Sequence, residues 1–382
     1  MGRHAWRRDS ESFMNQPVAS ASQSPAPSAA FTPRVWLVTG YRAGERAQIL
    51  ALAEALGWPF ELKQLSYRKS EFRTSLFRGS DLRGIRLDRS SALAPPWPDL
   101  VISAGMRNEP VGRWIRRQSG GRTRLVHIGR PWARPEQFDL LVTTPQYRLP
   151  EADNIVHNTT TLHRVTGARL AGEADRHRQR YAHLPQPRIG VILGGDSGPY
   201  TLGPRTAAHI AGLASTLARQ QGGSLLITSS ARTSPRALAA FERHLTVPYD
   251  LYAWRPDDQD NPYYAILGLS ASLVVTADSV SMLSEACATA KPVYMAELGG
   301  YGYPMRPGGG TPVDFRLSAL TYSWIMRFGH RRLSRDLRLV HRALIEQGRA
   351  VWLGENFPAA PPAPPRDLER AVQRVRALFE AE

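Results

Sequence analysis

The sequence contains a single cysteine, Cys287, among 382 residues. One cysteine can form neither a disulfide framework nor a cysteine-based metal site, which fits a reducing compartment. Long apolar runs are also missing: no stretch reaches the roughly 18 apolar residues that a membrane-spanning helix needs, and none follows the basic start as a secretory signal would require. We therefore expect a cytoplasmic protein whose membrane contact is at most peripheral, at the inner face.

Acidic residues are scarce relative to basic ones. Lysine and arginine number 49 against 33 for aspartate and glutamate, and the formal net charge is +16. This excess favours an anionic partner such as a nucleotide, a nucleic acid or an acidic membrane surface, although a coding bias towards arginine explains it equally well. No known nucleic-acid-binding module is present, and aromatic residues show little interleaving with a basic stripe, so we do not expect nucleic acid as the partner.

Composition and periodicity divide the chain into four segments. Residues 1–33 are rich in Ser, Pro and Ala without periodicity, which predicts disorder. Short β-rich runs then alternate with helical stretches; this alternation is interrupted at "LPQP" and begins again after it. This rhythm predicts an α/β fold with two Rossmann-like, doubly wound domains over residues 34–184 and 185–330, followed by C-terminal helices with a Pro-rich linker over 331–382.

The first candidate site is the loop "TGYRAGERAQ". Ligands of open parallel sheets bind at the carboxyl ends of the strands, and this loop places Gly40, Arg42 and Gly44 between a strand and a helix. Glycines there let a ligand approach the backbone, and the helix N-terminus offers N–H groups. The loop matches neither the GxGxxG pattern nor the P-loop, which argues against a dinucleotide site or an ATPase. A simple tight turn is an equally good interpretation.

The loop "ILGGDSGPYTLG" opens the second domain at the equivalent position. Its letters "GDSGP" resemble the serine signature of trypsin-like proteases, but Ser197 precedes His209, whereas those proteases place the histidine first. They are also β-barrels, and this loop joins a strand to a helix. We therefore expect Gly194, Gly195 and Ser197 to approach a phosphate or a sugar instead.

Two further loops follow strands of the second domain. In "ITSSARTSPRAL", Arg232 can grip a phosphate through two parallel hydrogen bonds, whereas Ser234 before a proline is an ordinary helix cap. In "WRPDDQDNPYYAIL", Asp258–Asp260 matches the Asp-x-Asp motif with which one class of glycosyltransferases holds a metal. Asn261 before a proline predicts a helix cap there, and we expect no metal site.

The stretch "TADSVSMLSEACATAKPV" crowds hydroxyl groups at the start of a helix. Ser279 and Ser281 can present hydroxyls and backbone N–H groups to a diphosphate. Glu285 lies four residues after Ser281 on the same helix face, where its carboxylate can accept hydrogen bonds from a ribose diol. The plainer interpretation is that the serines cap the helix and Glu285 faces solvent.

Together these motifs resemble the GT-B-type nucleotide-sugar proteins. They are most similar to the "elongated mitochondria" family of mitochondrial fission, whose members are also described as predicted nucleoside-diphosphate-sugar epimerases. The similarity runs over roughly residues 35–300. Besides the loops above it includes "PDLVISAGMRNEPV", "FDLLVTTPQY", "NIVHNTTTLHRVT" and "NPYYAILGLSA".

The resemblance implies that Ser279, Ser281 and Arg232 contact a diphosphate and that Glu285 holds the ribose. The acceptor or reacting sugar would lie against Gly40–Gly44 and Gly105–Asn108. We therefore expect a metal-independent transferase of hexosyl or N-acetylhexosaminyl groups that needs no cofactor and takes a nucleotide-diphosphate sugar, such as a UDP-sugar, as donor.

Such a transferase needs a general base for its acceptor hydroxyl. The candidates are Glu45 in the first loop, Glu109 after "GMRN" and His127 at a strand end, although a lone residue of each kind more often has a capping or structural role.

Two alternatives remain open. One is a nucleoside-diphosphate-sugar epimerase that uses the same diphosphate site. The other is a non-catalytic adaptor at a membrane surface, supported by a basic helix predicted over 331–349 with Leu333, Leu337, Val340 and Leu344 on one stripe. The same helix would serve a transferase with a lipid-linked acceptor. Its simplest interpretation is a surface helix packed on the domain by that stripe.

Overall fold

The computed structural model describes residues 31–40, 42–68, 79–329, 334–358 and 360–380. Residues 33–382 belong to one compact unit, which is described here by itself. Most of the predicted disordered segment, residues 1–30, lies outside the described residues.

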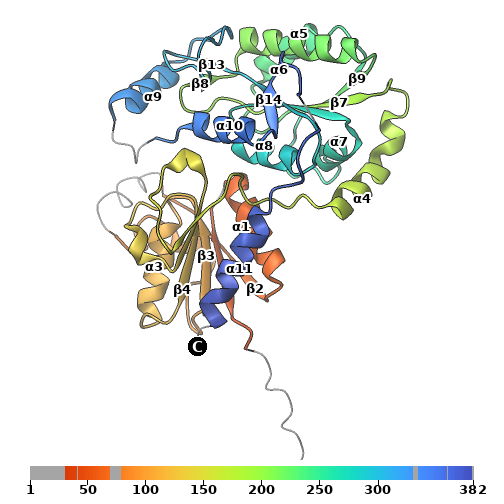
Figure 1. The fold of residues 1–382 in the computed structure, drawn as a ribbon. Helices are drawn as coiled ribbons and strands as arrows, with labels where there is room; N and C mark the ends of the chain where they lie inside the picture. The colour runs from red at the N-terminus through yellow and green to blue at the C-terminus, as the bar shows by residue number, and fades with distance from the viewer. Residues whose placement is uncertain (1–30, 41, 69–78, 330–333, 359, 381–382) are drawn as a thin grey trace, which may run out of the picture. The chain divides into compact units, whose positions relative to one another are not determined.

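The first sheet is parallel throughout, with strand order β2-β1-β3-β4-β5-β6 (Figure 1). Its strands are β1 (Val35–Thr39), β2 (Phe60–Gln64), β3 (Leu100–Ala104), β4 (Arg124–Ile128), β5 (Leu140–Thr143) and β6 (Ile155–His157). Three of them, β1, β3 and β5, are buried over their whole length, as expected for strands covered by helices on both faces.

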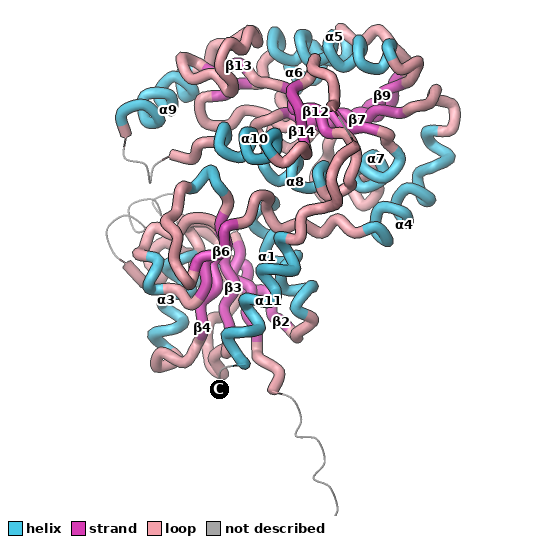
Figure 2. Tube along the Cα trace, viewed as in Figure 1, coloured by secondary structure: helices cyan, strands magenta, loops and turns pink. Residues whose placement is uncertain are grey.

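Side chains of β1 alternate between two hydrophobic clusters. Val35 and Leu37 pack with α1 (Ala43–Leu56) and α11 (Asp367–Glu380), whereas Trp36 and Val38 pack with α3 (Glu109–Gln118) on the opposite face. Figure 2 shows the strands between these two helical layers. The sheet is therefore sandwiched between two helical layers.

The second sheet is also parallel, with the order β10-β9-β7-β11-β12-β14. The strands are β7 (Arg188–Ile192), β9 (Ser224–Thr228), β10 (Tyr249–Tyr252), β11 (Ser272–Thr276), β12 (Val293–Ala296) and β14 (Ala350–Trp352). Counted along the chain, this is the 3-2-1-4-5-6 order of the Rossmann fold. The predicted fold class, α/β with two Rossmann-like domains, is confirmed.

The helices of the second half follow the predicted pattern. They are α4 (Gly167–His177), α5 (Pro204–Gln220), α6 (Pro235–Arg243), α7 (Tyr263–Leu269), α8 (Val280–Cys287), α9 (Leu317–Phe328) and α10 (Leu337–Glu346). A short antiparallel pair, β8 (Tyr200–Thr201) and β13 (Gly299–Gly300), lies beside the main sheet.

Helix α4 packs on α7 of the second domain. The domain boundary that we predict from the sequence, at residue 184, assigns this helix to the first domain instead. Gly268 of α7 makes this contact close, because a methyl group there would lie 2.8 Å from the carbonyl oxygen of Leu170. Near the other end of the chain, α11 packs on α1. The chain thus builds the first sheet, then the second, and then returns to the first.

The basic helix predicted over 331–349 is shorter in the structure. Helix α10 begins after Asp336, whose side chain accepts a hydrogen bond from the backbone N–H of Arg338, and Leu333 lies outside the described residues. Leu337, Val340 and Leu344 are buried in the core of the second domain. The interpretation of a surface helix packed by its apolar stripe is confirmed.

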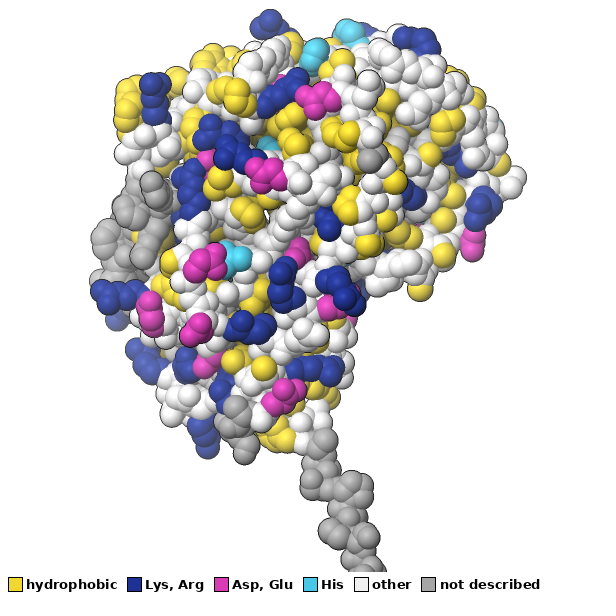
Figure 3. All heavy atoms as spheres, in the orientation of Figure 1, with side chains coloured by type: hydrophobic (Ala, Val, Ile, Leu, Met, Phe, Trp, Pro, Cys, Tyr) yellow, Lys and Arg dark blue, Asp and Glu magenta, His cyan; other side chains and the backbone are white. Residues whose placement is uncertain are grey.

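Among the described residues, no helix is both long enough and apolar enough to cross a bilayer. Basic side chains are spread over the face of the molecule drawn in Figure 3, as the net charge of +16 leads one to expect.

Candidate functional site

Three of the four loops that we singled out in the second domain follow β7, β9 and β11, which are neighbours in the second sheet. The strand order changes direction between β7 and β11, the first and fourth strands of that sheet along the chain. Loops at such a switch point run to opposite faces of the sheet and leave a crevice for a ligand. The predicted residues Gly194, Arg232 and Ser279 lie in the three loops at this carboxyl edge.

Asp278, the second residue after β11, joins these loops. It is 2% exposed, and its Oδ2 atom accepts a hydrogen bond from the backbone N–H of Gly195 at 3.1 Å and pairs with Nη1 of Arg232 at 2.6 Å. Its Oδ1 atom is buried and makes no hydrogen bond within the described residues. A buried carboxylate held in this way fixes the position of the arginine.

Arg232 is partly exposed and contacts the glycine-rich loop as well. Its Nη1 atom also donates to the carbonyl oxygens of Gly195 at 3.4 Å and Asp196 at 3.2 Å. Within the described residues, every hydrogen bond and ion pair of this guanidinium is made by Nη1. Nε and Nη2 are thereby left for another acceptor.

Positions 194 and 195 have no room for a side chain, because neighbouring loops pack directly against their backbone. A methyl group at Gly194 would overlap the carboxylate of Asp278, and one at Gly195 would overlap the carbonyl oxygen of Arg232. The hydroxyl of Ser197 accepts a hydrogen bond from Arg335 at 2.9 Å. The loop after β7 is therefore locked against the loops after β9 and β11.

Helix α8 begins at the same edge. Ser279 is the residue before its first turn. Among the described residues, the Ser279 side chain makes no capping hydrogen bond to this helix. A methyl group at Gly44 would lie 3.6 Å from Oγ of Ser281, so the first glycine loop and the start of α8 approach each other. Two sequence stretches more than 200 residues apart therefore face one site.

Glu285 lies on α8 and accepts a short hydrogen bond from the hydroxyl of Tyr263. Burial raises the pKa of Glu285 to about 7, although the Tyr263 hydrogen bond and the charge of Arg169 oppose the shift. Burial and the neighbouring glutamate raise the pKa of Tyr263 well above its ordinary value. The pair is thus a partly buried hydrogen-bonding unit rather than a solvated carboxylate.

In the first domain, Glu45 lies in the first turn of α1. It pairs with Arg42 at 3.2 Å, and its carboxylate lies against Gly105, where a methyl group would overlap it. Burial raises the pKa of Glu45 above its ordinary value, although nearby arginines, including Arg335 of the second domain, oppose the shift. Gly40 is tightly placed as well, since a methyl group there would lie 2.7 Å from the ring of Tyr67.

The other two base candidates lie in the interior. Glu109 is fully buried, pairs with Arg113 at 2.7 Å, and accepts hydrogen bonds from two backbone N–H groups. His127 is fully buried beside Ser103, and burial lowers the pKa of His127 to about 3. Neither side chain reaches the surface where a substrate could bind.

Of the two predicted helix caps, the one at Ser234 is observed, since its Oγ atom accepts a hydrogen bond from the backbone N–H of Ala237 at 3.1 Å. The other was placed one residue too early: the N-cap of α7 is Pro262, and Oδ1 of Asn261, the residue before it, accepts a hydrogen bond from the backbone N–H of Tyr263 at 3.1 Å. Asp258 accepts hydrogen bonds from the Tyr252 hydroxyl and a backbone N–H. No group of three or more His, Cys, Asp or Glu side chains that could hold a metal lies in the described ranges.

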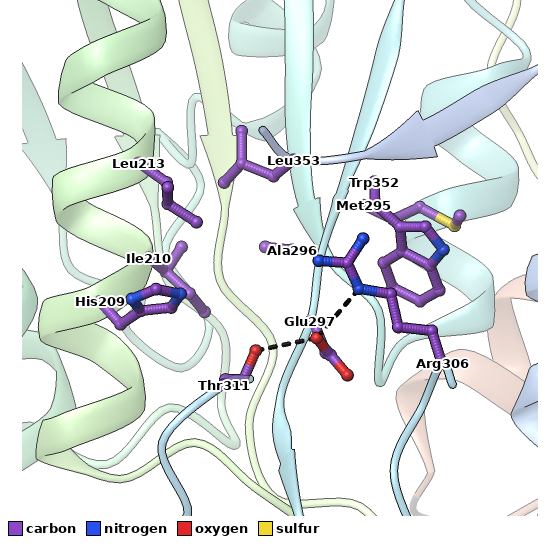
Figure 4. A pocket seen from close by; sticks show the side chains of 10 residues that line it. All are labelled: His209, Ile210, Leu213, Met295, Ala296, Glu297, Arg306, Thr311, Trp352 and Leu353. Atoms are coloured by element: carbon purple, nitrogen blue, oxygen red, sulfur yellow. Dashed lines mark hydrogen bonds and ion pairs between the residues drawn. The ribbon is translucent and has the colours of Figure 1, made fainter. Parts of the chain in front are cut away.

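A small pocket lies away from these loops, between α5, β12 and β14 (Figure 4). Three of its polar side chains are joined, because Glu297 accepts hydrogen bonds from Arg306 at 3.2 Å and Thr311 at 3.0 Å. None of the site residues expected from the sequence lines this pocket.

Sequence reasoning missed three members of the candidate site: Asp278, Tyr263 and Arg335. For Asp278 a signal existed, since a carboxylate shortly after a buried strand and beside a glycine-rich loop is positioned to organise both. For the other two there was none, because their partners lie far away in the sequence.

Comparison with known proteins gives related sequences and similar folds. A family model described as "Mitochondrial fission ELM1" matches residues 43–306. The mitochondrial fission protein ELM1 of Arabidopsis thaliana is 28% identical over 239 residues, which cover 56% of this chain and 55% of that protein. This chain thus spans about half the length of that relative. An uncharacterized Rickettsia prowazekii protein, RP120, is 22% identical over 297 residues, covering 68% of this chain and 82% of its own.

Two solved structures represent the similar folds. A glycosyltransferase from Rickettsia africae has a TM-score of 0.46 at 10% identity, with 92% of this chain and 98% of that chain covered. A UDP-GlcNAc 2-epimerase from Neisseria meningitidis, solved with UDP-GlcNAc bound, has a TM-score of 0.44 at 13% identity, with 91% and 100% covered.

Proposed function

The chain belongs to the mitochondrial fission ELM1 family, and from its site geometry we propose that it binds a nucleotide-diphosphate sugar at the carboxyl edge of the second sheet. The proposed activity is metal-independent glycosyl transfer, with a UDP-sugar as the donor. The observation that carries the proposal is Arg232, held through Nη1 by Asp278 beside the start of α8.

This arrangement suits a diphosphate. Nε and Nη2 of a guanidinium can bind two oxygens of one phosphate, and the first turn of α8 adds backbone N–H groups and the positive end of the helix dipole. Ser279 and Ser281 would add hydroxyls. These groups would also stabilise the negative charge that develops on the departing diphosphate, which is the role a metal has in other transferases.

Glu285 would recognise the ribose. Its carboxylate is fixed by Tyr263, and a carboxylate held in place can accept hydrogen bonds from a vicinal diol. The ribose would follow the diphosphate along α8, since Glu285 lies one turn beyond Ser281.

Glu45 is the general base that the geometry favours. It alone of the three candidates is partly exposed at the edge where Gly44 approaches Ser281, and its pKa is raised by burial. A carboxylate with a raised pKa accepts a proton from an acceptor hydroxyl more effectively than an ordinary one.

A thermal-shift screen tests the donor site. UDP, GDP, CDP and dTDP are added separately to the wild type, to Arg232→Gln and to Glu285→Ala. The matched control is Arg236→Gln, at an exposed position of α6. We expect one nucleoside diphosphate to stabilise the wild type and the control, with weaker stabilisation of both site variants. A shift unchanged in Arg232→Gln removes the diphosphate assignment, and no shift with any nucleotide favours the adaptor.

The reaction type needs a second measurement. The nucleotide sugar that binds is incubated with the protein without an acceptor, and the sugar is analysed by proton NMR. An unchanged sugar agrees with a transferase that waits for its acceptor, whereas rapid formation of the C2 epimer establishes the epimerase alternative instead.

A further inference from the structure

Helix α9 exposes an apolar face to solvent. Leu317, Trp324 and Phe328 are 67%, 63% and 68% exposed, and together with Thr321 they follow a spacing of four, three and four residues. Such positions lie on one side of a helix. Phe315, just before the helix, is 72% exposed. Large apolar side chains that gather on a surface in this way mark an interaction site.

The opposite side of α9 is attached to the second domain. Ala319 is fully buried, and the ring of Tyr322 lies where a methyl group on Gly198 would come within 2.9 Å of it. Arg316, the residue before the helix, pairs with Asp196 at 3.2 Å. The apolar face is therefore held outward by specific contacts on the other side of the helix.

The charge around this face is positive. Helix α9 contains no acidic residue, and Arg327 extends beside Phe328 with its guanidinium 5.5 Å from the ring. The nearest preceding acid, Asp314, turns away, because its carboxylate accepts hydrogen bonds from the backbone N–H groups of Arg205 and Thr206 at the start of α5. Figure 3 shows hydrophobic and basic side chains together where Figure 1 places α9.

We propose that α9 docks on the surface of an anionic lipid bilayer. Trp324, Phe328 and Leu317 would enter the boundary between headgroups and acyl chains, with the helix parallel to the membrane plane. Arg327 would reach the lipid phosphates while its stem stays on the apolar surface. A second copy of the chain fits less well, since a symmetric contact through this face would bring the Arg327 side chains near each other with no carboxylate between them.

This assignment replaces the predicted helix 331–349 as the membrane-contacting element, because the apolar stripe of α10 is buried. It does not depend on nucleotide binding. Through Arg316 and Tyr322, however, a docked α9 would hold the loop of Gly194–Gly198 close to the bilayer.

Vesicle flotation of the full chain tests the proposal. Phosphatidylcholine vesicles with and without phosphatidylserine are mixed at low salt with the wild type, with the double variant Trp324→Ser and Phe328→Ser, and with Arg327→Glu. The double variant Leu87→Ser and Tyr249→Ser, at exposed apolar positions elsewhere, is the matched control. Circular dichroism and the nucleotide thermal shift check that each variant folds and keeps its donor site.

The wild type and the control should float with phosphatidylserine vesicles and only weakly with phosphatidylcholine alone. The α9 double variant should lose about tenfold or more in partitioning, and Arg327→Glu about tenfold on the anionic vesicles only. Equal flotation of the wild type and the α9 double variant would overturn the proposal. The proposal would also be overturned if the wild type binds no vesicles but forms a concentration-dependent dimer that the α9 double variant does not form.

Discussion

Individual carboxylates in this protein differ mainly in their surroundings. Glu45 and Glu109 both begin helices that follow strands of the first sheet, yet Glu45 is partly exposed at the site edge and Glu109 is neutralised in the interior by Arg113 and backbone N–H groups. A general base has to reach the substrate, which is why we propose Glu45 rather than the buried Glu109 for this role.

We expect Glu45→Gln to lower kcat for sugar transfer by about 10²–10⁴-fold, because an amide cannot accept the acceptor's proton. The nucleotide thermal shift should stay as in the wild type. In the wild type, activity should fall as the pH drops through a pKa above the ordinary carboxyl value, since burial favours the protonated form of Glu45. Initial rates over a pH series measure this, with Glu54→Gln on the same helix as control; equal rates for the two variants contradict the assignment.

Glu285 makes the stability depend on pH. The unfolded chain releases this proton near the ordinary pKa of 4.5, whereas the folded protein keeps it up to about pH 7. The folded state therefore binds more protons in this window, and the free energy of unfolding falls as the pH rises through it. Glu285→Gln cannot ionise, so it should gain about 1–3 kcal/mol relative to the wild type between about pH 5 and pH 8.

Urea unfolding at both pH values checks this expectation, with Glu380→Gln on the exposed side of α11 as control. The control should follow the pH dependence of the wild type. If Glu285→Gln follows it as well, the glutamate is already ionised in the folded protein at the lower pH.

Among the structural elements, the three loops at the carboxyl edge of the second sheet act as one unit. Gly195 donates its N–H to Asp278 and lies directly against the backbone of Arg232. The side chains of Ser230 and Thr233 donate hydrogen bonds to the carbonyl oxygen of Gly194. A change in any of these loops should therefore affect the other two.

Gly195→Ala and Gly212→Ala make the same chemical change with opposite expected results. At Gly195 the new methyl group meets the carbonyl oxygen of Arg232, so we expect a loss of about 1–3 kcal/mol in unfolding free energy and weaker nucleotide binding. At Gly212, exposed in the middle of α5 with open space around it, we expect a gain of about 0.5–1 kcal/mol. Urea unfolding and the nucleotide screen measure both, and a neutral Gly195→Ala contradicts the interlocked loops.

Elements of regular structure were predictable where local pattern determines them. The strand "SLVVT" has an apolar centre and is buried along its whole length, as expected for a strand covered on both faces, and Ser234 marks a helix start by its side-chain chemistry. Partners far apart in the sequence were not predictable in this way. The pair of Arg232 and Asp278 forms only because β9 and β11 flank β7, and the burial of Glu109 depends on the chain around Trp132.

On the scale of the whole chain, the first domain is built from residues that precede the second domain in the sequence and from helix α11, which follows it. Val375 of α11 is fully buried in the same cluster as Ile49 and Leu52 of α1, and the rings of Phe379 and Trp58 meet edge to face at 5.4 Å. Helix α11 thus covers apolar surface that α1 would otherwise expose to water.

Val375→Asp should destabilise the first domain by at least about 3 kcal/mol, because it buries a carboxylate without a partner. Gln373→Asp, on the exposed side of the same helix, should be nearly neutral. Hydrogen exchange followed by mass spectrometry should show lost protection in α1 and the first sheet, with the second sheet protected as in the wild type. Equal loss in both sheets would mean that the two domains unfold together.

The return of α11 also sets an order of events during synthesis. Domains generally fold as they leave the ribosome, N-terminal first, but here the entire second sheet is translated before the helix that covers α1. The domain that leaves the ribosome first is therefore the last to complete its hydrophobic core. Throughout that interval the apolar side of α1 lacks the helix that covers it, so it is open to contact with neighbouring chains.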